Sequence, residues 1–401
     1  MRKTMGLLLV ITVLILSLAG CLSPVELDAN GYVVLIGADR GVNKKYYFTL
    51  ALQRELAEQN TESEGGAIAL ACEGDSIFEA VNELEGNVPY TLNFSRTNFI
   101  VISRELAEEG ALRELVTTSF DSLRVRTSAV VLVTDGEVSE FVGGMYANND
   151  ANISKLQSAL MLDEEKTGMV SVMSVSRLLE ANAEGRFDYC TALGSYDDGI
   201  ITDMEQKKTE SEGKNPLGYV EKGDRVGGLK SLVSGTALFS GWSMTGELTR
   251  EETVFLNMAV GDFKSGVITL EYRDGSTVSV LLSMGSVKRE VDFGAEGVKA
   301  KLRVRLYAAA HLADEDISPR DMDEWLTGDL ARFLEGRLYE VFEKCRSAGS
   351  DAMRLGTELS KRFGSAEELE KFGWREAYRG MSAEFIVETV NVDKYVSERM
   401  Q

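Results

Sequence analysis

Along the first half of the chain, short apolar runs of strand length alternate with segments that repeat apolar residues every three or four positions. The apolar runs predict strands at 32–36, 46–53, 98–103, 128–133 and 189–193. The periodic segments predict helices at 76–85, 105–123, 153–162 and 174–184, and Ser76 with Glu79 provides a capping box for the first. This order predicts an α/β N-terminal domain, built from one lobe or two.

The second half has a different pattern, with several strands, then helices, then one strand. Strands are predicted at 232–239, 266–273, 277–282, 287–293, 298–308 and 383–392. One helix is predicted to begin with a capping box of Thr249 and Glu252. Further helices are predicted from Ser318 to Cys345, at 351–363 and from Ser365. The pattern predicts an α+β C-terminal domain with a mainly antiparallel sheet and one long packed helix.

The segment between the halves is polar and rich in glycine. It spans 203–228 and is interpreted as a linker or loop. We therefore divide the chain into a signal segment at 1–20, an N-terminal domain at 21–202, this linker, and a C-terminal domain at 229–396.

The first twenty residues predict export. Arg2 and Lys3 precede an apolar run that is too short for a permanent membrane span. The run ends in Leu18, Ala19, Gly20 and Cys21, which resembles the bacterial lipobox. In that interpretation cleavage falls between Gly20 and Cys21, and Cys21 carries a diacylglyceryl group, with room for a third acyl chain on the freed amine. An ordinary signal peptide is the alternative. The lipid would hold the protein on the extracytoplasmic face of a membrane.

Composition narrows the classes of function. The 401 residues include 43 Lys and Arg against 64 Asp and Glu, for a formal charge of -21. Such an anionic chain is a poor partner for nucleic acid. The single histidine, His311, argues against triads and most zinc sites. Nucleophile-elbow, phosphate-loop and dinucleotide motifs do not occur in the sequence, so we predict a protein without catalysis.

Three further groups of residues could suggest a catalytic or metal site, but we favour a structural role for each. Ser211 and Lys214 have the spacing of a nucleophile and its base but lie in the polar linker. The acidic group Asp314, Glu315, Asp316, Asp321 and Asp323 lacks the pattern of a calcium loop and suits a helix start. His311 follows three alanines at the end of a strand. No metal site or other cofactor is predicted.

Cys72, Cys190 and Cys345 remain after the predicted lipid cysteine. Their long spacings contain no metal-binding pair. Cys72 and Cys345 lie in apolar patterns, so we favour buried free thiols. A single disulfide among the three is the alternative.

Four cations alternate with apolar residues in the strand predicted at 298–308. They are Lys299, Lys301, Arg303 and Arg305, and the alternation places them on one face of the strand. The stripe is either a docking surface for an acidic partner or lipid head groups, or a solvated face balanced by neighbouring carboxylates. We favour the second because cross-strand ion pairs form readily in so acidic a chain.

The segment 235–248, GTALFSGWSMTGEL, predicts a strand and a tight turn. Gly235 and Gly246 bracket it, where glycine permits positive φ or the close approach of another backbone. Leu238 or Phe239 must point inward by alternation. Together with Glu252, these residues form a candidate structural motif that acts through packing.

Several of these segments resemble one known family. The resemblance begins at Cys21, Glu26, Leu27 and Asp28 and at the strand end Ile36, Gly37, Ala38 and Asp39. It continues at Gly74, Ser76, Glu79 and Ala80, at 98–102, at 105–110, at 130–136 and at 235–248. It ends at Asp351, Leu355, Gly356, Leu359, Trp374 and Phe385. In this order they resemble the spore germination lipoproteins of the Ger(x)C type, the GerAC-type C subunits of germinant receptors in endospore-forming bacteria.

The resemblance implies several α/β lobes and a protein without catalysis. It also implies two integral membrane subunits as partners, one of them transporter-like, and a place at the spore inner membrane. Germinant recognition in the family is usually attributed to the transporter-like subunit, and the lipoprotein serves assembly or signalling. Two other classes stay open: an extracytoplasmic solute-binding lipoprotein, which shares the anchor and α/β lobes, and a lipoprotein enzyme.

Overall fold

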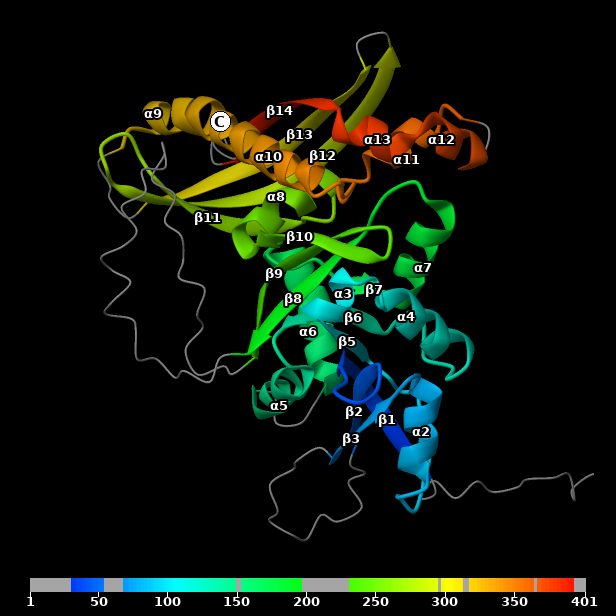
Figure 1. Ribbon diagram of the computed structural model, residues 1–401. Coiled ribbons are helices and arrows are strands. Elements are labelled where there is room, and N and C mark those ends of the chain that lie inside the picture. Colours follow the sequence, from blue (N-terminus) through cyan, green and yellow to red (C-terminus); the bar gives the residue numbers. More distant parts are fainter. Residues whose placement is uncertain are drawn as a thin grey trace, which may run out of the picture.

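The computed structural model describes residues 30–53, 68–148, 153–196, 231–294, 297–312, 317–363 and 366–392. Within them the chain forms two sheets, one in the lower and one in the upper part of Figure 1. The predicted signal segment with Gly20, the predicted lipid-bearing Cys21, and the predicted linker at 203–228 lie outside the described residues.

The larger sheet has ten strands. They are β1 (Asn30–Arg40), β2 (Tyr46–Leu52), β3 (Ile68–Gly74), β4 (Thr91–Asn93), β5 (Phe99–Ser103), β6 (Val130–Asp135), β7 (Met173–Ser174), β8 (Cys190–Tyr196), β9 (Ser231–Ser240) and β10 (Ser243–Thr249). The order along the sheet is β10-β9-β8-β6-β5-β1-β2-β3, with β4 paired to β1 and β7 to β6. The central strands β1, β5, β6 and β8 are parallel, and an antiparallel pair closes each end.

Helices cover both faces of this sheet. They are α2 (Ile77–Glu85), α3 (Arg104–Glu108), α4 (Leu112–Asp121), α5 (Val138–Asn148), α6 (Ile153–Lys166) and α7 (Val175–Glu184). One buried cluster joins α2, α3, α4 and α7 to one face, and another joins α5 and α6 to the other. The predicted α/β fold of the N-terminal domain is confirmed as three layers.

The strands after the predicted linker belong to the larger sheet. The predicted C-terminal domain opens at 229 with the strand 232–239, and in the structure this strand, β9, pairs with β8, while β10 pairs with β9. The burial of β9 explains this pairing, since Leu238 packs in one hydrophobic cluster and Phe239 in another. A strand with apolar residues on both faces needs a place inside a covered sheet.

The smaller sheet has four strands in the order β11-β12-β13-β14. They are β11 (Ser265–Glu271), β12 (Thr277–Gly294), β13 (Gly297–Leu312) and β14 (Ser382–Asn391). Only the pairing of β13 with β14 is parallel, which confirms a mainly antiparallel sheet. The two strands predicted at 277–282 and 287–293 form the single strand β12, whose register shifts between Met284 and Ser286. The glycine and serines at this shift resemble a turn in the sequence but form a bulge.

The C-terminal helices lie on one face of the smaller sheet (Figure 1). They are α8 (Arg250–Val260), α9 (Pro319–Glu324), α10 (Leu330–Ser347), α11 (Leu355–Ser360), α12 (Ala366–Phe372) and α13 (Trp374–Arg379). A π-helical segment, Trp325–Asp329, joins α9 to α10, and the Leu330 N–H bonds to the Trp325 carbonyl. The helix predicted from Ser318 to Cys345 is therefore continuous but contains one wider turn.

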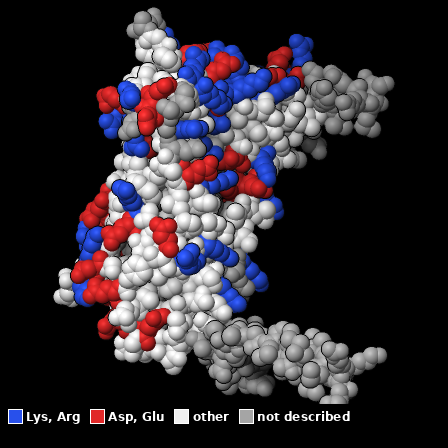
Figure 2. All heavy atoms as spheres, turned by 90° about the vertical axis from the view of Figure 1, so that its right-hand side faces the viewer, with Lys and Arg blue, Asp and Glu red and all other residues white. Residues whose placement is uncertain are grey.

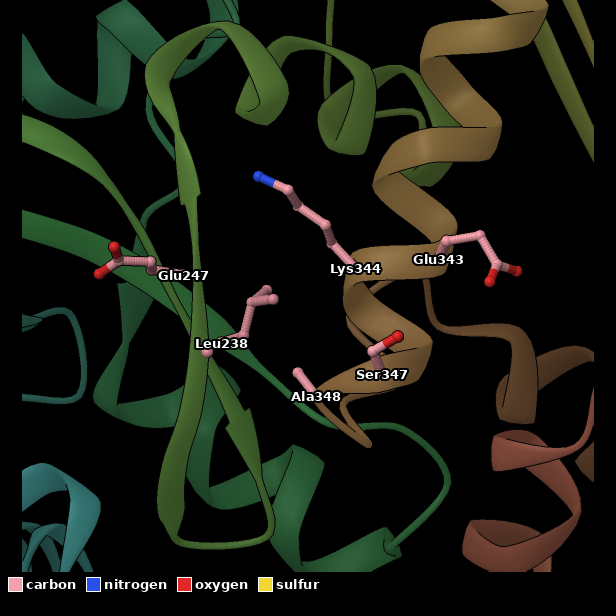
Figure 3. A pocket seen from close by; sticks show the side chains of 7 residues that line it. Leu238, Glu247, Glu343, Lys344, Ser347 and Ala348 are labelled. Carbon is pink, nitrogen blue, oxygen red and sulfur yellow. The ribbon is translucent and has the colours of Figure 1, made fainter.

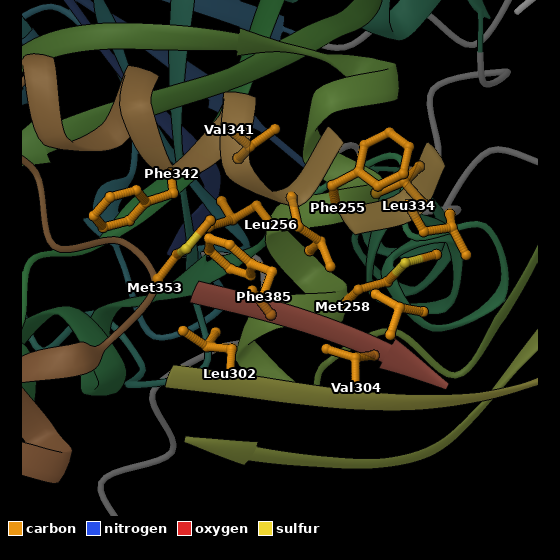
Figure 4. Close-up of a cluster of buried hydrophobic side chains, with 14 of the residues drawn as sticks. Phe255, Leu256, Met258, Leu302, Val304, Leu334, Val341, Phe342, Met353 and Phe385 are labelled. Carbon is orange, nitrogen blue, oxygen red and sulfur yellow. The ribbon is translucent and has the colours of Figure 1, made fainter. Parts of the chain in front are cut away.

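Helix α8 connects the two sheets and is buried on all sides. Every residue from Thr253 to Val260 is buried. Its Phe255, Leu256 and Met258 pack with side chains of α10, β13 and β14, as Figure 4 shows. A helix without a solvent face must lie between other elements, so α8 makes the domains share one core.

Among the helices that the structure describes, none has the length and apolar composition of a membrane span.

Candidate functional site: the junction between the domains

The hairpin of β9 and β10 lies where the two domains meet. Both predicted glycines leave room there for a neighbouring segment. A Cβ atom added at Gly235 would lie 2.2 Å from the Leu248 carbonyl oxygen, and one added at Gly246 would lie 2.9 Å from Ala348 Cβ. Positive φ occurs instead at Gly241, at 61°, in the turn between the strands. Gly235 and Gly246 therefore permit close approach, and Gly241 provides the turn.

Phe239 and Leu238 are both completely buried. Phe239 stacks on Tyr189, with 4.5 Å between ring centroids, and Leu238 faces the C-terminal core. The alternation predicted that one of the two side chains points inward. In the structure both are buried, because β9 is covered on both faces.

Glu252 forms the predicted capping box with Thr249 at the start of α8. Thr249 Oγ1 accepts from the Glu252 N–H at 3.3 Å, and the Glu252 carboxylate accepts from the Thr249 N–H at 2.9 Å. The same carboxylate pairs with Lys344 of α10 at 2.5 Å. Glu252 thus fixes the start of α8 and ties it to α10.

Asp188 connects three segments at the junction. Its Oδ1 accepts from the Gly241 N–H at 2.8 Å and lies 3.1 Å from the Arg375 guanidinium. Its Oδ2 accepts from the Asp351 N–H at 3.1 Å. The carboxylate is nearly buried, so it holds the hairpin turn and the C-terminal loop against the large sheet.

Asp351 organises the C-terminal side of this contact. Its carboxylate accepts from the N–H groups of Leu355 at 2.8 Å and Gly356 at 2.7 Å, at the start of α11. Burial raises the pKa of this carboxyl well above its ordinary value, while the two backbone hydrogen bonds oppose the increase. A Cβ added at Gly356 would lie 2.0 Å from the Arg186 carbonyl oxygen, so the backbones of the two domains meet here.

Arg354 adds a third interdomain contact. It is one of two residues other than glycine with positive φ in the described chain, at 58°. Its guanidinium donates to Asp262 at 2.9 Å and lies 5.7 Å from the ring of Phe187. A residue other than glycine adopts this backbone conformation only when its surroundings hold it there.

A cavity of about 300 Å³ opens between the hairpin and the end of α10 (Figure 3). It is lined by Leu238, Gly246, Glu247, Glu343, Lys344, Ser347 and Ala348. Its charged residues already have partners: Glu247 pairs with Arg104, Glu343 with Arg346, and Lys344 with Glu252. The cavity therefore offers an apolar floor, and its ionic groups are engaged in contacts within the protein.

The cationic stripe on β13 lies beside carboxylates on the neighbouring strands. Lys301 pairs with Glu384 at 2.9 Å, Arg303 with Glu290 at 2.8 Å and Arg305 with Glu388 at 3.5 Å. Lys301, Arg303 and Arg305 thus have the cross-strand partners that the solvated-face interpretation requires. Figure 2 shows the same mixing elsewhere, with Lys and Arg interspersed with Asp and Glu on one side of the molecule.

The three remaining cysteines are free. Cys190 and Cys345 are buried, and burial raises the pKa of Cys190 to about 11 and that of Cys345 well above its ordinary value. In the described ranges no group of three His, Cys, Asp or Glu residues could hold a metal ion. Ser318 caps α9 by accepting from the Asp321 N–H at 3.2 Å, which gives the described end of the predicted acidic group a structural role.

Asp188 is not part of any motif that the sequence shows. It lies just before a predicted strand with no local pattern that marks it, and its partners are distant in sequence. Asp351, Gly356 and Trp374 are marked in the sequence only by the family resemblance. The structure brings them together with Asp188, Gly241 and Arg375, and this arrangement can fix the orientation of one domain on the other.

These features define a two-domain protein whose α/β and α+β parts are joined by a shared core and buried carboxylates. Two family models match the chain: the spore germination protein N-terminal domain over residues 23–191, and a C-terminal domain described as spore germination B3/GerAC like over residues 234–394. The chain therefore belongs to the Ger(x)C family of spore germination proteins, as the resemblance indicated.

Individual relatives agree with this assignment. The chain is 25% identical over 174 residues to YfkR of Bacillus subtilis (strain 168), which is described as a spore germination protein. That match spans 40% of this chain and 42% of the relative, so it covers less than half of either protein. The crystal structure of the GerBC protein has the same fold, with a TM-score of 0.55, 12% identity, and coverage of 89% of this chain and 96% of that one.

Proposed function

We propose that this chain is the lipid-anchored, non-catalytic subunit of a germinant receptor complex. In this role it binds two integral membrane subunits, one of them transporter-like, on the extracytoplasmic face of the spore inner membrane. It serves assembly or signalling in the response to nutrients. Family membership over both domains is the observation that carries the proposal.

The anchor is the second part of the proposal. Cys21 ends a lipobox-like sequence and lies two residues before the first matched domain, which begins at residue 23. A lipid on Cys21 would hold both domains at the membrane, where the proposed partners lie. The interdomain contacts of Asp188 and Asp351 suit a subunit that presents one fixed surface to its partners.

The test uses spores of the bacterium that carries the gene. Spores without the chain should fail to release ions and dipicolinic acid when nutrients are added, and the wild-type gene should restore release. Cys21→Ala should abolish labelling with radioactive palmitate and reduce membrane association. Normal nutrient germination of the deletion spores would contradict the receptor role, and continued lipid labelling of Cys21→Ala would contradict the anchor.

A solute-binding lipoprotein remains the alternative class. Its signature would be an increase in melting temperature with amino acids, sugars or nucleosides, because a ligand that binds only the folded state stabilises it. The cavity beside α10 does not favour this function, since its charged residues pair within the protein.

A further inference from the structure

Three neighbouring segments at one end of the larger sheet contain no acidic residue. They lead into β5, into β6, and through β7 into α7. The sequence has no Asp or Glu at 86–103, 122–134 or 167–179, although 64 of the 401 residues of the chain are acidic. Each of the three segments contains arginine, so this end of the sheet carries local positive charge in a strongly anionic protein.

Hydrogen bonds hold the three segments side by side. The Arg126 side chain, on the middle segment, donates from Nε to the Thr97 carbonyl at 3.0 Å. The Ser176 N–H, at the start of α7, donates to the Thr127 carbonyl at 3.0 Å. The middle segment is therefore bonded to both of the others, and the arginines belong to one continuous surface.

Four arginines lie on these segments. Arg96, Arg124 and Arg177 are exposed, and Arg126 is half-buried. In the part of the chain that the structure describes, no ion pair joins any of the four to a carboxylate. Burial lowers the pKa of Arg126, and no neighbouring carboxylate opposes this among the described residues. Burial raises the pKa of Glu164, and the charge of Arg177 is among the influences that oppose the increase without an ion pair.

The same end of the sheet lies beside the predicted lipid anchor. The Arg96 guanidinium lies 3.9 Å from the ring centroid of Tyr32, near the start of β1 at Asn30. Cys21 precedes Asn30 by nine residues, which span at most roughly 30 Å when fully extended. A lipid on Cys21 would therefore let this end of the sheet reach the head groups and would limit how far it moves away. Figure 1 shows β1 in the lower part of the molecule, away from the smaller sheet.

The chain also has acidic residues near this end of the sheet. Segment 54–67, which joins β2 to β3, contains four Glu and one Arg. In the sheet, β1 separates β2 from β5, so this segment starts and ends on the other side of β1 from the arginines. The arginines are therefore available to an anionic partner outside the protein. Lipid phosphate is favoured over an acidic protein segment because head groups are present wherever the anchor is, and guanidinium groups bind phosphate oxygens well.

We propose that this end of the larger sheet lies against the membrane and that Arg96, Arg124 and Arg177 bind the phosphates of lipid head groups there. Arg126 holds the three segments together. The inference rests on the proposed function, because the lipid on Cys21 brings this end of the sheet to the membrane. An anchor at one residue leaves the protein free to rotate, whereas contacts at three arginines fix its orientation and direct the smaller sheet away from the membrane.

The test uses the full chain, expressed in a bacterium that lipidates it and reconstituted into phosphatidylcholine vesicles with or without phosphatidylglycerol. A fluorescent amino acid at position 128, an exposed serine beside Arg126, reports contact with lipids whose head groups carry a nitroxide quencher. Position 382, an exposed serine on β14, is the control site. We expect strong quenching at position 128 in vesicles with phosphatidylglycerol, and little without it or at position 382, because anionic lipid attracts the arginines.

A pair of charge variants tests the arginines directly. Arg96→Gln with Arg124→Gln removes two of the exposed cations. Arg320→Gln with Arg332→Gln makes the same change of charge on α9 and α10, at side chains that are 88% and 75% exposed. Each cation near an anionic surface favours contact roughly fivefold. We expect the first pair to reduce the equilibrium constant for contact, obtained from the quenching, roughly tenfold or more, and the second pair to leave it unchanged. Thermal melts check that both variants fold.

Unchanged quenching at position 128 in the Arg96→Gln, Arg124→Gln protein would overturn the inference and leave the anchor standing. Stronger quenching at position 382 than at position 128 would do the same. Quenching at position 128 that occurs only when the membrane subunits are present would overturn it in favour of an acidic protein partner. A wild-type chain that carries no lipid and does not stay on the vesicles would overturn the proposed anchor and this inference together.

Discussion

The carboxylate of Asp188 accepts a hydrogen bond from the backbone N–H of Asp351 at 3.1 Å, across the boundary between the two domains. Asp351 in turn uses its own carboxylate to hold the start of α11. Two acidic residues thus lie close together, and backbone N–H groups, with Arg375 beside Asp188, balance their charge. One buried side chain thus bonds to the hairpin turn and to the C-terminal loop, and adds to the shared core that holds the domains together.

Replacing Asp188 by Ala should therefore destabilise the protein strongly. The N–H groups of Gly241 and Asp351 would lose their acceptor, and each buried unpaired donor costs about 1–3 kcal/mol. We expect a loss of about 2–5 kcal/mol in the free energy of unfolding, measured by urea denaturation. Arg375→Ala is the control, since its side chain is 53% exposed and such ion pairs contribute about 1 kcal/mol or less. Equal effects of the two variants would contradict the account.

Local signals in the sequence were sufficient for many elements. The capping box of Thr249 and Glu252 marks the start of α8, because the two side-chain acceptors and the two backbone N–H donors lie within one turn. At α2, Ser76 accepts from the Glu79 N–H as expected, but the Glu79 carboxylate accepts from Asp75 instead of completing the box. The order of apolar runs indicated both fold classes, since strand and helix periods differ.

Features that depend on distant contacts could not be predicted from local patterns. Strand β9 joins the larger sheet because it pairs with β8. Strand β8 precedes it by more than thirty residues in the sequence, so no local pattern shows the pairing. The junction of Asp188 with Asp351 depends on how the two cores pack. The π-helical turn at Trp325 keeps both Trp325 and Leu326 fully buried, and that requirement arises from the surrounding core.

Asp39 should titrate at an elevated pH. Burial raises its pKa to about 6, Glu137 adds to the increase, and the hydrogen bond from the Val138 N–H opposes it. The folded state then binds the proton more tightly than the unfolded state, so the contribution of Asp39 to stability falls as pH rises from about 4 to about 6. The full shift corresponds to no more than about 3 kcal/mol, reduced by solvent around the partly exposed carboxyl.

Asp39→Asn provides the comparison because it keeps an oxygen that can accept from Val138. The difference in unfolding free energy between wild type and Asp39→Asn should change in favour of the variant between pH 4 and pH 6 and stay constant above. Carboxyl NMR shifts should give the midpoint directly. A midpoint near 4 would show that the carboxyl is better solvated than the structure indicates.

Phe239→Ala should remove a ring that is fully buried and stacked on Tyr189. Truncating a buried phenylalanine typically costs about 3–5 kcal/mol. We expect less folded protein and, through it, weaker complex assembly and germination. Leu162→Ala, at a side chain that is 46% exposed, should leave stability nearly unchanged. Phe239→Ala protein that melts like wild type but fails to support germination would identify the hairpin as a direct contact surface instead.

Gly235→Ala and Gly336→Ala should change stability in opposite directions. A methyl group at Gly235 meets the Leu248 carbonyl oxygen, so the hairpin must shift and the variant should be destabilised by more than about 1 kcal/mol. Nothing lies within 4 Å of the added atom at Gly336, in the interior of α10. There alanine should stabilise the helix by about 0.5–1 kcal/mol. Thermal melts of both proteins test the pair, and destabilisation by both substitutions would contradict the steric argument.

Limited proteolysis tests how the halves depend on each other. The polar segment 203–228 contains Lys207, Lys208 and Lys214, and we expect trypsin to cut there first. Strands β8 and β9 pair across the cut from Cys190 and Leu238 to Tyr196 and Ser231, and the domains share the core around α8. The two fragments should therefore stay together in gel filtration and separate only in denaturant. First cleavage within α10 would contradict the domain organisation, and fragments that separate without denaturant would contradict the shared sheet and core.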